Sequence, residues 1–292
     1  MKRLILFNIF LFLFAIGLHG CHITARLNHP DKVSQSRLET ILIEDIRDGG
    51  LDTPFIQACL IASDVDTDKK MQKYIDKINN LIFRLNYETD AKSVNNPITK
   101  ATIIFDWLQK NANDGTYKDC YDVKDTLNIN VGNCLSYAIR FTILCRYYDV
   151  DINNIFVPGH VYNMIEYEGQ KKYFEHTHSD GIVKSGDLNN PQRKIMNDIE
   201  VIAEIFIYKA RNYNTEMKYE KSLEYCQMAL LCSPDDNRPV ILLIDNYIAE
   251  KRYNEAFQYL DTYLARHPDD RISFKNTYVI LQKLCKKGDT IF

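Results

Sequence analysis

The chain has 292 residues, of which 46% are hydrophobic and 26% charged, and its formal net charge is −3. This composition is ordinary for a globular protein, and the length suits one large domain or two smaller ones. The sequence contains no basic patch and no run of Lys and Arg, which excludes nucleic acid as an expected partner.

The N-terminus is predicted to be a targeting segment. Lys2 and Arg3 form a short positive region, and Leu4–Leu18 is almost wholly apolar. Such a run is too short to span a bilayer comfortably and is typical of the core of a signal peptide. It ends in Leu18-His19-Gly20-Cys21, which resembles the lipobox of bacterial lipoproteins, although a small or apolar residue usually stands in the place of His19.

The lipobox resemblance implies cleavage before Cys21 and attachment of lipid to this cysteine. We therefore predict a signal peptide at 1–20 and a tether at 21–33, in a protein anchored to a membrane of the bacterial cell envelope, on the periplasmic side or at the cell surface. Loss of Lys2 and Arg3 leaves 34 basic against 39 acidic residues, a charge of −5, so lipid and not basic charge would hold the protein to the membrane. A plain cleaved signal and a retained membrane anchor are the alternatives.

Cysteine usage argues against a disulfide framework. Seven of the eight cysteines remain once Cys21 is set aside, an odd number at irregular spacing. No CxxC occurs, so a zinc site made of thiolates is not expected. Cys59 and Cys145 are interpreted as buried core residues. Cys120 lies in a polar segment with no helix start to activate it, and no reactive role is expected for it.

Start signals and helical spacing predict a helical N-terminal part. The predicted helices cover Ser36–Arg47, Thr53–Ala62, and stretches that begin at Thr67 and at Asn96-Pro97. Gly49-Gly50 is expected to stop the first helix, and Thr53 is expected to cap the second, with Pro54 as its first residue. The polar segment from Asn111 to Asn130 is expected to be irregular.

A change of period then predicts a small sheet. A helix is expected from Cys134 to about Tyr148, and the apolar residues that follow alternate instead of recurring at helical spacing. The predicted strands are Ile155–Val157, His160–Tyr167 and Lys171–Thr177. Glu168-Gly169 is expected to join the last two as a hairpin in which residue i faces residue 337 − i. Asn190-Pro191 is expected to start the return to helix.

The C-terminal part repeats with a period of 34 residues. Tyr213 aligns with Tyr247 and Pro234 with Pro268, each pair 34 apart, and the words Ser-Pro-Asp-Asp and His-Pro-Asp-Asp recur at the same interval. This period resembles the tetratricopeptide repeat, which implies helix pairs from about Ile202 to Asp270 and a closing helix to about Leu284. The paired aspartates are interpreted as turn and cap residues.

Three residues have the pattern of a thiol active site. In Gly132-Asn133-Cys134-Leu135-Ser136, Asn133 is a good N-cap, which places Cys134 in a first helical turn, where the dipole and unpaired N–H groups favour a thiolate and can bind an oxyanion. His160 opens a predicted strand and Glu175 lies on the returning strand. By the 337 − i rule both side chains share one side of the sheet, one diagonal step apart, so that Glu175 can orient the His160 imidazole.

These motifs resemble the transglutaminase-like superfamily. The resemblance rests on Gly-Asn-Cys-Leu-Ser at 132–136, Val-Pro-Gly-His-Val at 157–161 and Phe-Glu-His-Thr at 174–177, and it covers about Leu38–Asp187. It is closer to a bacterial branch in which tetratricopeptide repeats often follow. By motif position it implies catalytic roles for Cys134, His160 and Glu175, although the acid is commonly Asp in the wider superfamily.

The expected fold class is therefore α+β. N-terminal helices and a Cys-bearing helix pack on a small antiparallel sheet in a transglutaminase-like, papain-like core at 34–198, and an all-α tetratricopeptide-like repeat follows at 199–287. The resemblance implies amide hydrolysis or acyl transfer on a peptide or protein substrate, with no cofactor. The alternative is a catalytically inactive scaffold that binds a partner protein or peptide through its repeats.

His176 and His178 raise the question of a metal site. Two residues apart on a strand, they would share a face opposite to that of His160 and Glu175, so one site could not use all three histidines. We interpret them as solvated histidines at a strand end and expect no metal.

Overall fold

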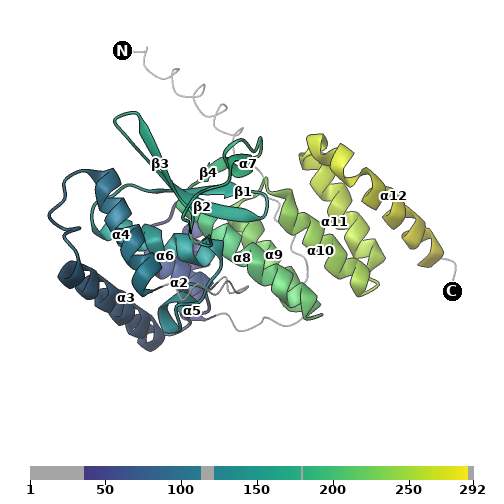
Figure 1. The fold of residues 1–292 in the computed structure, drawn as a ribbon. Helices are drawn as coiled ribbons and strands as arrows, with labels where there is room; N and C mark the ends of the chain where they lie inside the picture. The colour runs from purple at the N-terminus through teal and green to yellow at the C-terminus, as the bar shows by residue number, and fades with distance from the viewer. Residues whose placement is uncertain (1–35, 113–121, 179, 289–292) are drawn as a thin grey trace, which may run out of the picture. The chain divides into compact units, whose positions relative to one another are not determined.

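The computed structural model describes residues 36–112, 122–178 and 180–288. The predicted signal peptide at 1–20, the predicted lipid site Cys21, the tether at 21–33 and Cys120 lie outside the described residues. Within them the chain is mostly helical with one four-stranded antiparallel sheet, so the predicted α+β class is confirmed (Figure 1). No helix in these ranges has both the length and the apolar character needed to cross a membrane.

The N-terminal helices begin at side chains that the sequence marks as caps. They are α1 (Arg37–Arg47), α2 (Phe55–Ala62), α3 (Asp68–Glu88) and α4 (Pro97–Asn111). Ser36, Thr67 and Asn96 accept hydrogen bonds from backbone amides of α1, α3 and α4, which confirms those three starts. The expectation for α2 is wrong, because Pro54 is its N-cap and the Thr53 amide donates to Asp45 Oδ2 at 2.8 Å.

Two further helices precede the sheet, α5 (Val123–Asn128) and α6 (Cys134–Tyr147). Helix α5 lies in the segment expected to be irregular, and that expectation is wrong there. Its six residues are too few to display a helical period, although Val123 and Leu127 are buried on one side. Helix α6 begins where the sequence predicts. Close packing at this start requires Gly132, since a Cβ there would lie 2.5 Å from Ser136 Oγ.

The sheet has the strand order β3-β2-β1-β4. Its strands are β1 (Asn153–Val157), β2 (His160–Tyr167), β3 (Gln170–Phe174) and β4 (Lys194–Met196). Pairs such as Asn163 with Phe174 and Tyr167 with Gln170 follow the expected 337 − i register. Positive φ at both Glu168 (50°) and Gly169 (76°) explains this, because a two-residue turn of that kind determines which residues pair.

The hairpin between β1 and β2 turns at Pro158-Gly159, where Gly159 has a φ of 81°. Strand β3 is shorter than expected and ends at Phe174, so Glu175 lies one residue beyond it. Asn190-Pro191 does not start a helix as expected. Instead, a short helix α7 (Ser185–Leu188) precedes it and strand β4 follows it. The sequence did not predict β4, because three residues are too few to display an alternating pattern.

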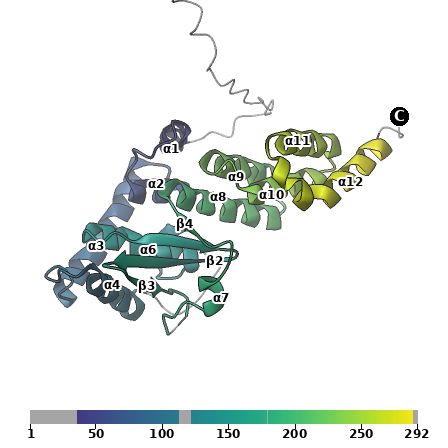
Figure 2. The same ribbon diagram turned by 90° about the horizontal axis from the view of Figure 1, so that it is seen from above.

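Helix α6 and helix α7 lie on opposite sides of the sheet (Figure 2). Val161 and Ile165 of β2 face the main core with α6, whereas Tyr162 and Met164 belong to a small cluster on the other side with Leu188 of α7.

The C-terminal part consists of antiparallel helices. They are α8 (Asp198–Thr215), α9 (Tyr219–Cys232), α10 (Asn237–Ala249), α11 (Tyr253–Arg266), the 3-10 helix η1 (Pro268–Asp270) and α12 (Arg271–Gly288). The period is visible in the backbone, because α9 and α11 each have 14 residues and begin 34 apart. The residues with positive φ before them, Met217 and Lys251, are 34 apart as well.

The main core extends beyond the sheet and the first six helices. It includes Val201 and Phe206 of α8 and Met228 and Cys232 of α9, whereas a second core joins α10 and α11 to the ends of α8 and α9. The first pair of C-terminal helices is thus packed as part of the same apolar interior as α1 and α2.

Candidate active site

Cys134 is the first residue of α6, and its position is set by a capping box. The Asn133 side chain accepts the Ser136 amide at 3.0 Å, and Ser136 Oγ accepts the Asn133 amide at 3.0 Å. The helix therefore cannot start earlier or later without losing both bonds. The amides of the first turn have no partner within a helix, so Cys134 lies where N–H groups and the helix dipole favour an anion. The residue is 2% exposed.

His160 is the first residue of β2 and lies opposite Val157, immediately after the Pro158-Gly159 turn. Its Nε2 is 2.5 Å from Glu175 Oε2. The Cys134 thiol is a second hydrogen-bond partner of the same imidazole. Because Glu175 occupies Nε2, the nitrogen left for the thiol is Nδ1. The three predicted site residues are thus brought together in the order thiol, imidazole, carboxylate.

Glu175 is held although it lies past the end of β3. Its Oε1 accepts the Thr177 amide at 2.7 Å and the Thr177 hydroxyl at 2.6 Å, while Oε2 accepts from His160. The residue is 1% exposed. Each carboxylate oxygen therefore has a donor, which is the arrangement that keeps a buried carboxylate ionised.

Charge and hydrogen bonding determine the protonation of this pair. Burial opposes the charged form of His160, but the hydrogen bonds and charges of Cys134 and Glu175 outweigh it and raise the pKa of His160 from 6.5 to about 10. Burial also opposes ionisation of Glu175, yet hydrogen bonds from His160 and Thr177 lower its pKa from 4.5 to about 2. At neutral pH an imidazolium therefore lies beside a carboxylate.

His176 is not the solvated residue that we expected. It is 5% exposed, and its ring packs against Phe105 and Phe141. Its Nε2 is 2.6 Å from Asn163 Oδ1, and burial lowers its pKa from 6.5 to about 3. The physical reason is that His176 lies two residues after Phe174 and so shares its face, and the Phe174 ring packs against the same Phe105 and Phe141 of α4 and α6.

His178 is half-buried, and no group of three or more His, Cys, Asp or Glu side chains that could hold a metal ion occurs among the described residues. Cys59 and Cys145 are fully buried in the main core, as expected, and burial raises the pKa of both thiols.

Sequence reasoning missed three buried polar side chains that connect to His176, namely Thr142, Asn154 and Asn163. One signal was available, since Asn163 occupies an inward position of an otherwise apolar strand, where an amide must find buried partners.

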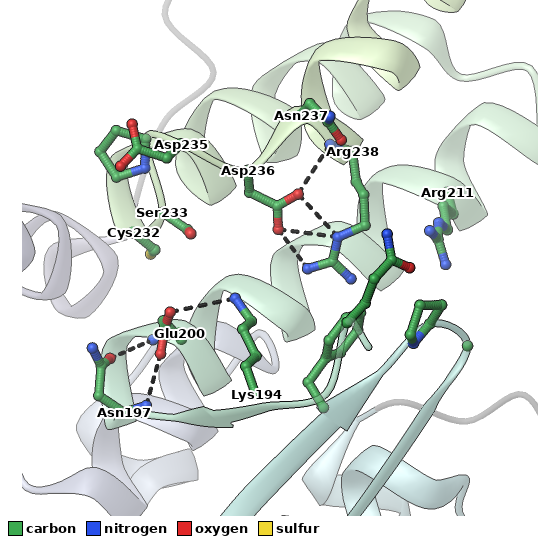
Figure 3. A pocket seen from close by; sticks show the side chains of 15 residues that line it. Lys194, Asn197, Glu200, Arg211, Cys232, Ser233, Asp235, Asp236, Asn237 and Arg238 are labelled. Carbon is green, nitrogen blue, oxygen red and sulfur yellow. Dashed lines mark hydrogen bonds and ion pairs between the residues drawn. The ribbon is translucent and has the colours of Figure 1, made fainter. Parts of the chain in front are cut away.

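A cavity of about 690 Å³ lies beside the turn that precedes His160 (Figure 3). Phe156 and Pro158 of the first hairpin line it on one side, and the turn between α9 and α10 lines it on the other. Its charges are largely matched, because Lys194 Nζ is 3.3 Å from Glu200 Oε1 and Arg238 donates to Asp236. None of the three triad residues lines this cavity.

The geometry can support attack by a cysteine sulfur on a carbonyl carbon, with an imidazole to move the proton and a carboxylate to orient the imidazole. No protein-family model, no curated protein and no solved structure matches the chain.

Proposed function

We propose that the chain is a cysteine-dependent hydrolase of the transglutaminase-like superfamily that cleaves an amide bond of a peptide or protein. The observation that carries this proposal is the hydrogen-bonded series from Cys134 through His160 to Glu175. Cys134, the proposed nucleophile, is the first residue of α6, and His160, the proposed base, is the first residue of β2. Both positions are those that the motifs of this superfamily would give them.

In the proposed reaction the Cys134 thiolate attacks the amide carbonyl carbon and forms a tetrahedral intermediate. Its oxyanion would be stabilised by N–H groups of the first turn of α6. The C–N bond then breaks as His160 donates its proton to the leaving amine, which leaves an acyl thioester on the sulfur. A water molecule gives a proton to His160 and attacks the thioester, which releases a carboxylic acid and returns the cysteine.

Hydrolysis is preferred over transfer of the acyl group to an amine. Acyl transfer requires a site that holds the amine and excludes water, and the sequence shows no feature for such an acceptor. The proposed chemistry uses only side chains, backbone N–H groups and water, so it implies no cofactor.

The proposed setting rests on the apolar segment before Cys21 and on the spacing of the C-terminal helices. We propose that Cys21 carries a lipid that anchors the protein to an envelope membrane, and that the helices from α8 to α12 form tetratricopeptide-like repeats. The 34-residue spacing of α9 and α11 supports the repeat proposal.

One observation favours a second candidate, an inactive scaffold that binds a partner through the repeats. Cys134 is only 2% exposed, which would block a large substrate. The two candidates differ in one measurable property, because a working thiol must react rapidly with a small electrophile and a blocked thiol does not.

The test is alkylation by iodoacetamide across pH, followed by mass spectrometry of each cysteine-containing peptide. The protein would begin at His22 and so retain the compact unit that starts at Ser36. Wild type is compared with His160→Ala, and the half-buried Cys285 of α12 serves as an internal reference thiol.

Rapid labelling of Cys134 at pH 6 that is lost in His160→Ala supports the hydrolase, since an ordinary thiol with a pKa of about 8.5 is only about 0.3% thiolate at that pH. Labelling of Cys134 no faster than that of Cys285, and unchanged by His160→Ala, would refute the hydrolase and favour the scaffold.

A further inference from the structure

We propose that Thr142, Asn154, Asn163 and His176 form a buried positioning network that holds the nucleophile, the base and the carboxylate in register. The inference rests on the proposed function, because it concerns the same Cys134–His160–Glu175 site. None of the four side chains touches the reacting atoms, so they are positioning residues and not catalytic residues.

The site has a positioning problem that the sheet does not solve. The pairing of β2 with β3 ends at Asn163 and Phe174, so the strand ladder does not hold Glu175. The backbone bonds that remain are long. The Glu175 amide donates to Gly181 O at 3.3 Å, and Gln109 Nε2 donates to the Glu175 carbonyl at 3.4 Å. The bonds from Thr177 hold the Glu175 carboxylate locally, from two residues further along the chain, but they do not attach this segment to the sheet. That attachment needs a further anchor.

His176, the next residue, supplies that anchor. The Asn163 amide oxygen can only accept, so His176 Nε2 carries the proton and donates to Asn163 Oδ1 at 2.6 Å. The ring is packed against Phe105 and Phe141 with centroid distances of 5.3 and 5.2 Å. Asn163 is the last residue of β2 that pairs with β3. The bond from His176 therefore attaches the chain to β2 just beyond the point where the backbone pairing ends.

Asn163 passes the connection on to two other elements. Its Nδ2 donates to Asn154 Oδ1 of β1 at 3.0 Å and to Thr142 Oγ1 of α6 at 3.1 Å. The Thr142 hydroxyl in turn lies 2.9 Å from the Ala138 carbonyl. Each of the four network side chains is at most 5% exposed, and the oxygen and both N–H groups of the Asn163 amide are used.

The network therefore links every segment that carries a catalytic residue. Thr142 is on the helix that begins at Cys134, Asn163 is on the strand that begins at His160, and His176 adjoins Glu175. Apolar side chains of similar size would fill this space without the cost of burying amides and a hydroxyl. Hydrogen bonds, unlike apolar contacts, require a particular geometry. They can all form in only one arrangement of α6, β1, β2 and the segment that carries Glu175.

The network also keeps its form over the pH range of the alkylation test. Burial lowers the pKa of His176 to about 3, so the ring stays neutral and Nε2 remains a donor from pH 5 upward. A pH profile of Cys134 reactivity therefore reports on Cys134 and His160 and is free of titration within the network.

The test compares Asn163→Leu with Asn246→Leu in the chain that begins at His22. Both asparagines are fully buried, and Asn246 is bonded in the same way within the C-terminal helices, where its Nδ2 donates to Ser222 Oγ at 2.8 Å. The two variants lose similar bonds, but only Asn163 adjoins the triad. The readout is the pH profile of Cys134 alkylation by iodoacetamide, with folding verified by circular dichroism.

We expect Asn163→Leu to lower the rate at pH 6 by at least about tenfold, toward that of an ordinary thiol, while Asn246→Leu keeps the wild-type profile. His176→Gln, which keeps an N–H donor at the end of the side chain, should retain more of the low-pH rate than His176→Leu. If Asn163→Leu fails to fold, the near-isosteric Thr142→Val provides the same comparison.

The outcomes distinguish a failure of this inference from a failure of the proposed function. A wild type without rapid labelling at pH 6 overturns the hydrolase and the network's role together. Rapid labelling in the wild type that persists in folded Asn163→Leu, His176→Leu or Thr142→Val overturns the network alone. Equal losses in Asn163→Leu and Asn246→Leu would show a general effect of stability and also overturn it.

Discussion

Replacing Glu175 by glutamine is expected to leave the site assembled and to disable it. In the wild type, Oε1 accepts the Thr177 amide and Oε2 accepts from His160 Nε2. The introduced amide has one oxygen and one NH2 group. The Thr177 amide can only donate, so the oxygen must face it and the NH2 group must face His160. Nε2 then becomes an acceptor, and the single proton of the neutral imidazole moves to Nδ1, toward Cys134.

The magnitude follows from the loss of the ion pair. An Nδ1–H directed at the sulfur cannot take the thiol proton, so the thiolate present at pH 6 should fall toward the roughly 0.3% of an ordinary thiol, a loss of about 300-fold in alkylation rate. The lowering of the Glu175 pKa from 4.5 to about 2 corresponds to about 3 kcal/mol of stability at pH 6. The raised pKa of His160 reflects the same ion pair together with the effect of Cys134, so it is not added as a second contribution to the free energy.

Two assays measure these losses. Alkylation of Cys134 at pH 6 gives the rate, and urea unfolding gives the free energy through Trp107, which is the single tryptophan of the chain and is 5% exposed. Glu166→Gln is the matched control, because Glu166 lies on β2 but forms an exposed ion pair with Lys171 at 3.2 Å. An alkylation rate in Glu175→Gln within twofold of wild type would refute the proposed coupling of carboxylate, imidazole and thiol.

Three further predictions concern stability. Because the pKa of His160 is raised in the folded protein, its contribution to the free energy of unfolding should be fully present below pH 6.5 and lost as pH rises through about 10. The difference in this free energy between wild type and His160→Gln should therefore shrink between pH 6 and pH 10. A constant difference would contradict the raised pKa. Gly132→Ala should lower the free energy of unfolding by about 1–3 kcal/mol in urea titrations, because the added Cβ would lie 2.5 Å from a side-chain oxygen, whereas Gly186→Ala, with no atom within 4 Å of an added Cβ, should have little effect. Arg238→Met should cost about 3–5 kcal/mol in the same assay, because it leaves Glu204, which is 2% exposed, without its cation; a loss below about 1 kcal/mol would show that this carboxylate finds another partner or is protonated.

The elements that the sequence predicts well are those with an explicit local signal. Asn133 marks the start of α6 through a capping box, and Glu168-Gly169 determines the hairpin register through two positive φ values. Each of these features depends on a few neighbouring residues. The same locality explains why the positions of Cys134 and His160 at element starts could be predicted before any contact between them was known.

The elements that the sequence does not predict depend on distant contacts. Helix α5 has six residues and β4 has three, so neither displays a period, and each is stabilised by the core it packs on. The environment of His176 is of the same kind. Its polarity and its place near a strand end suggest exposure, and only Phe105 on α4 and Asn163 on β2, 71 and 13 residues away, make it a buried residue.

The sharing of the main core with α8 and α9 has a consequence for the order in which the chain can fold. The apolar interior that surrounds α6 is completed by residues as far along as Cys232. A growing chain therefore cannot close this interior until most of its length has emerged, and until then the face that will receive α8 and α9 is open to water. The open face belongs to the part of the chain that carries the proposed nucleophile, so the site would be completed only after α8 and α9 have been added.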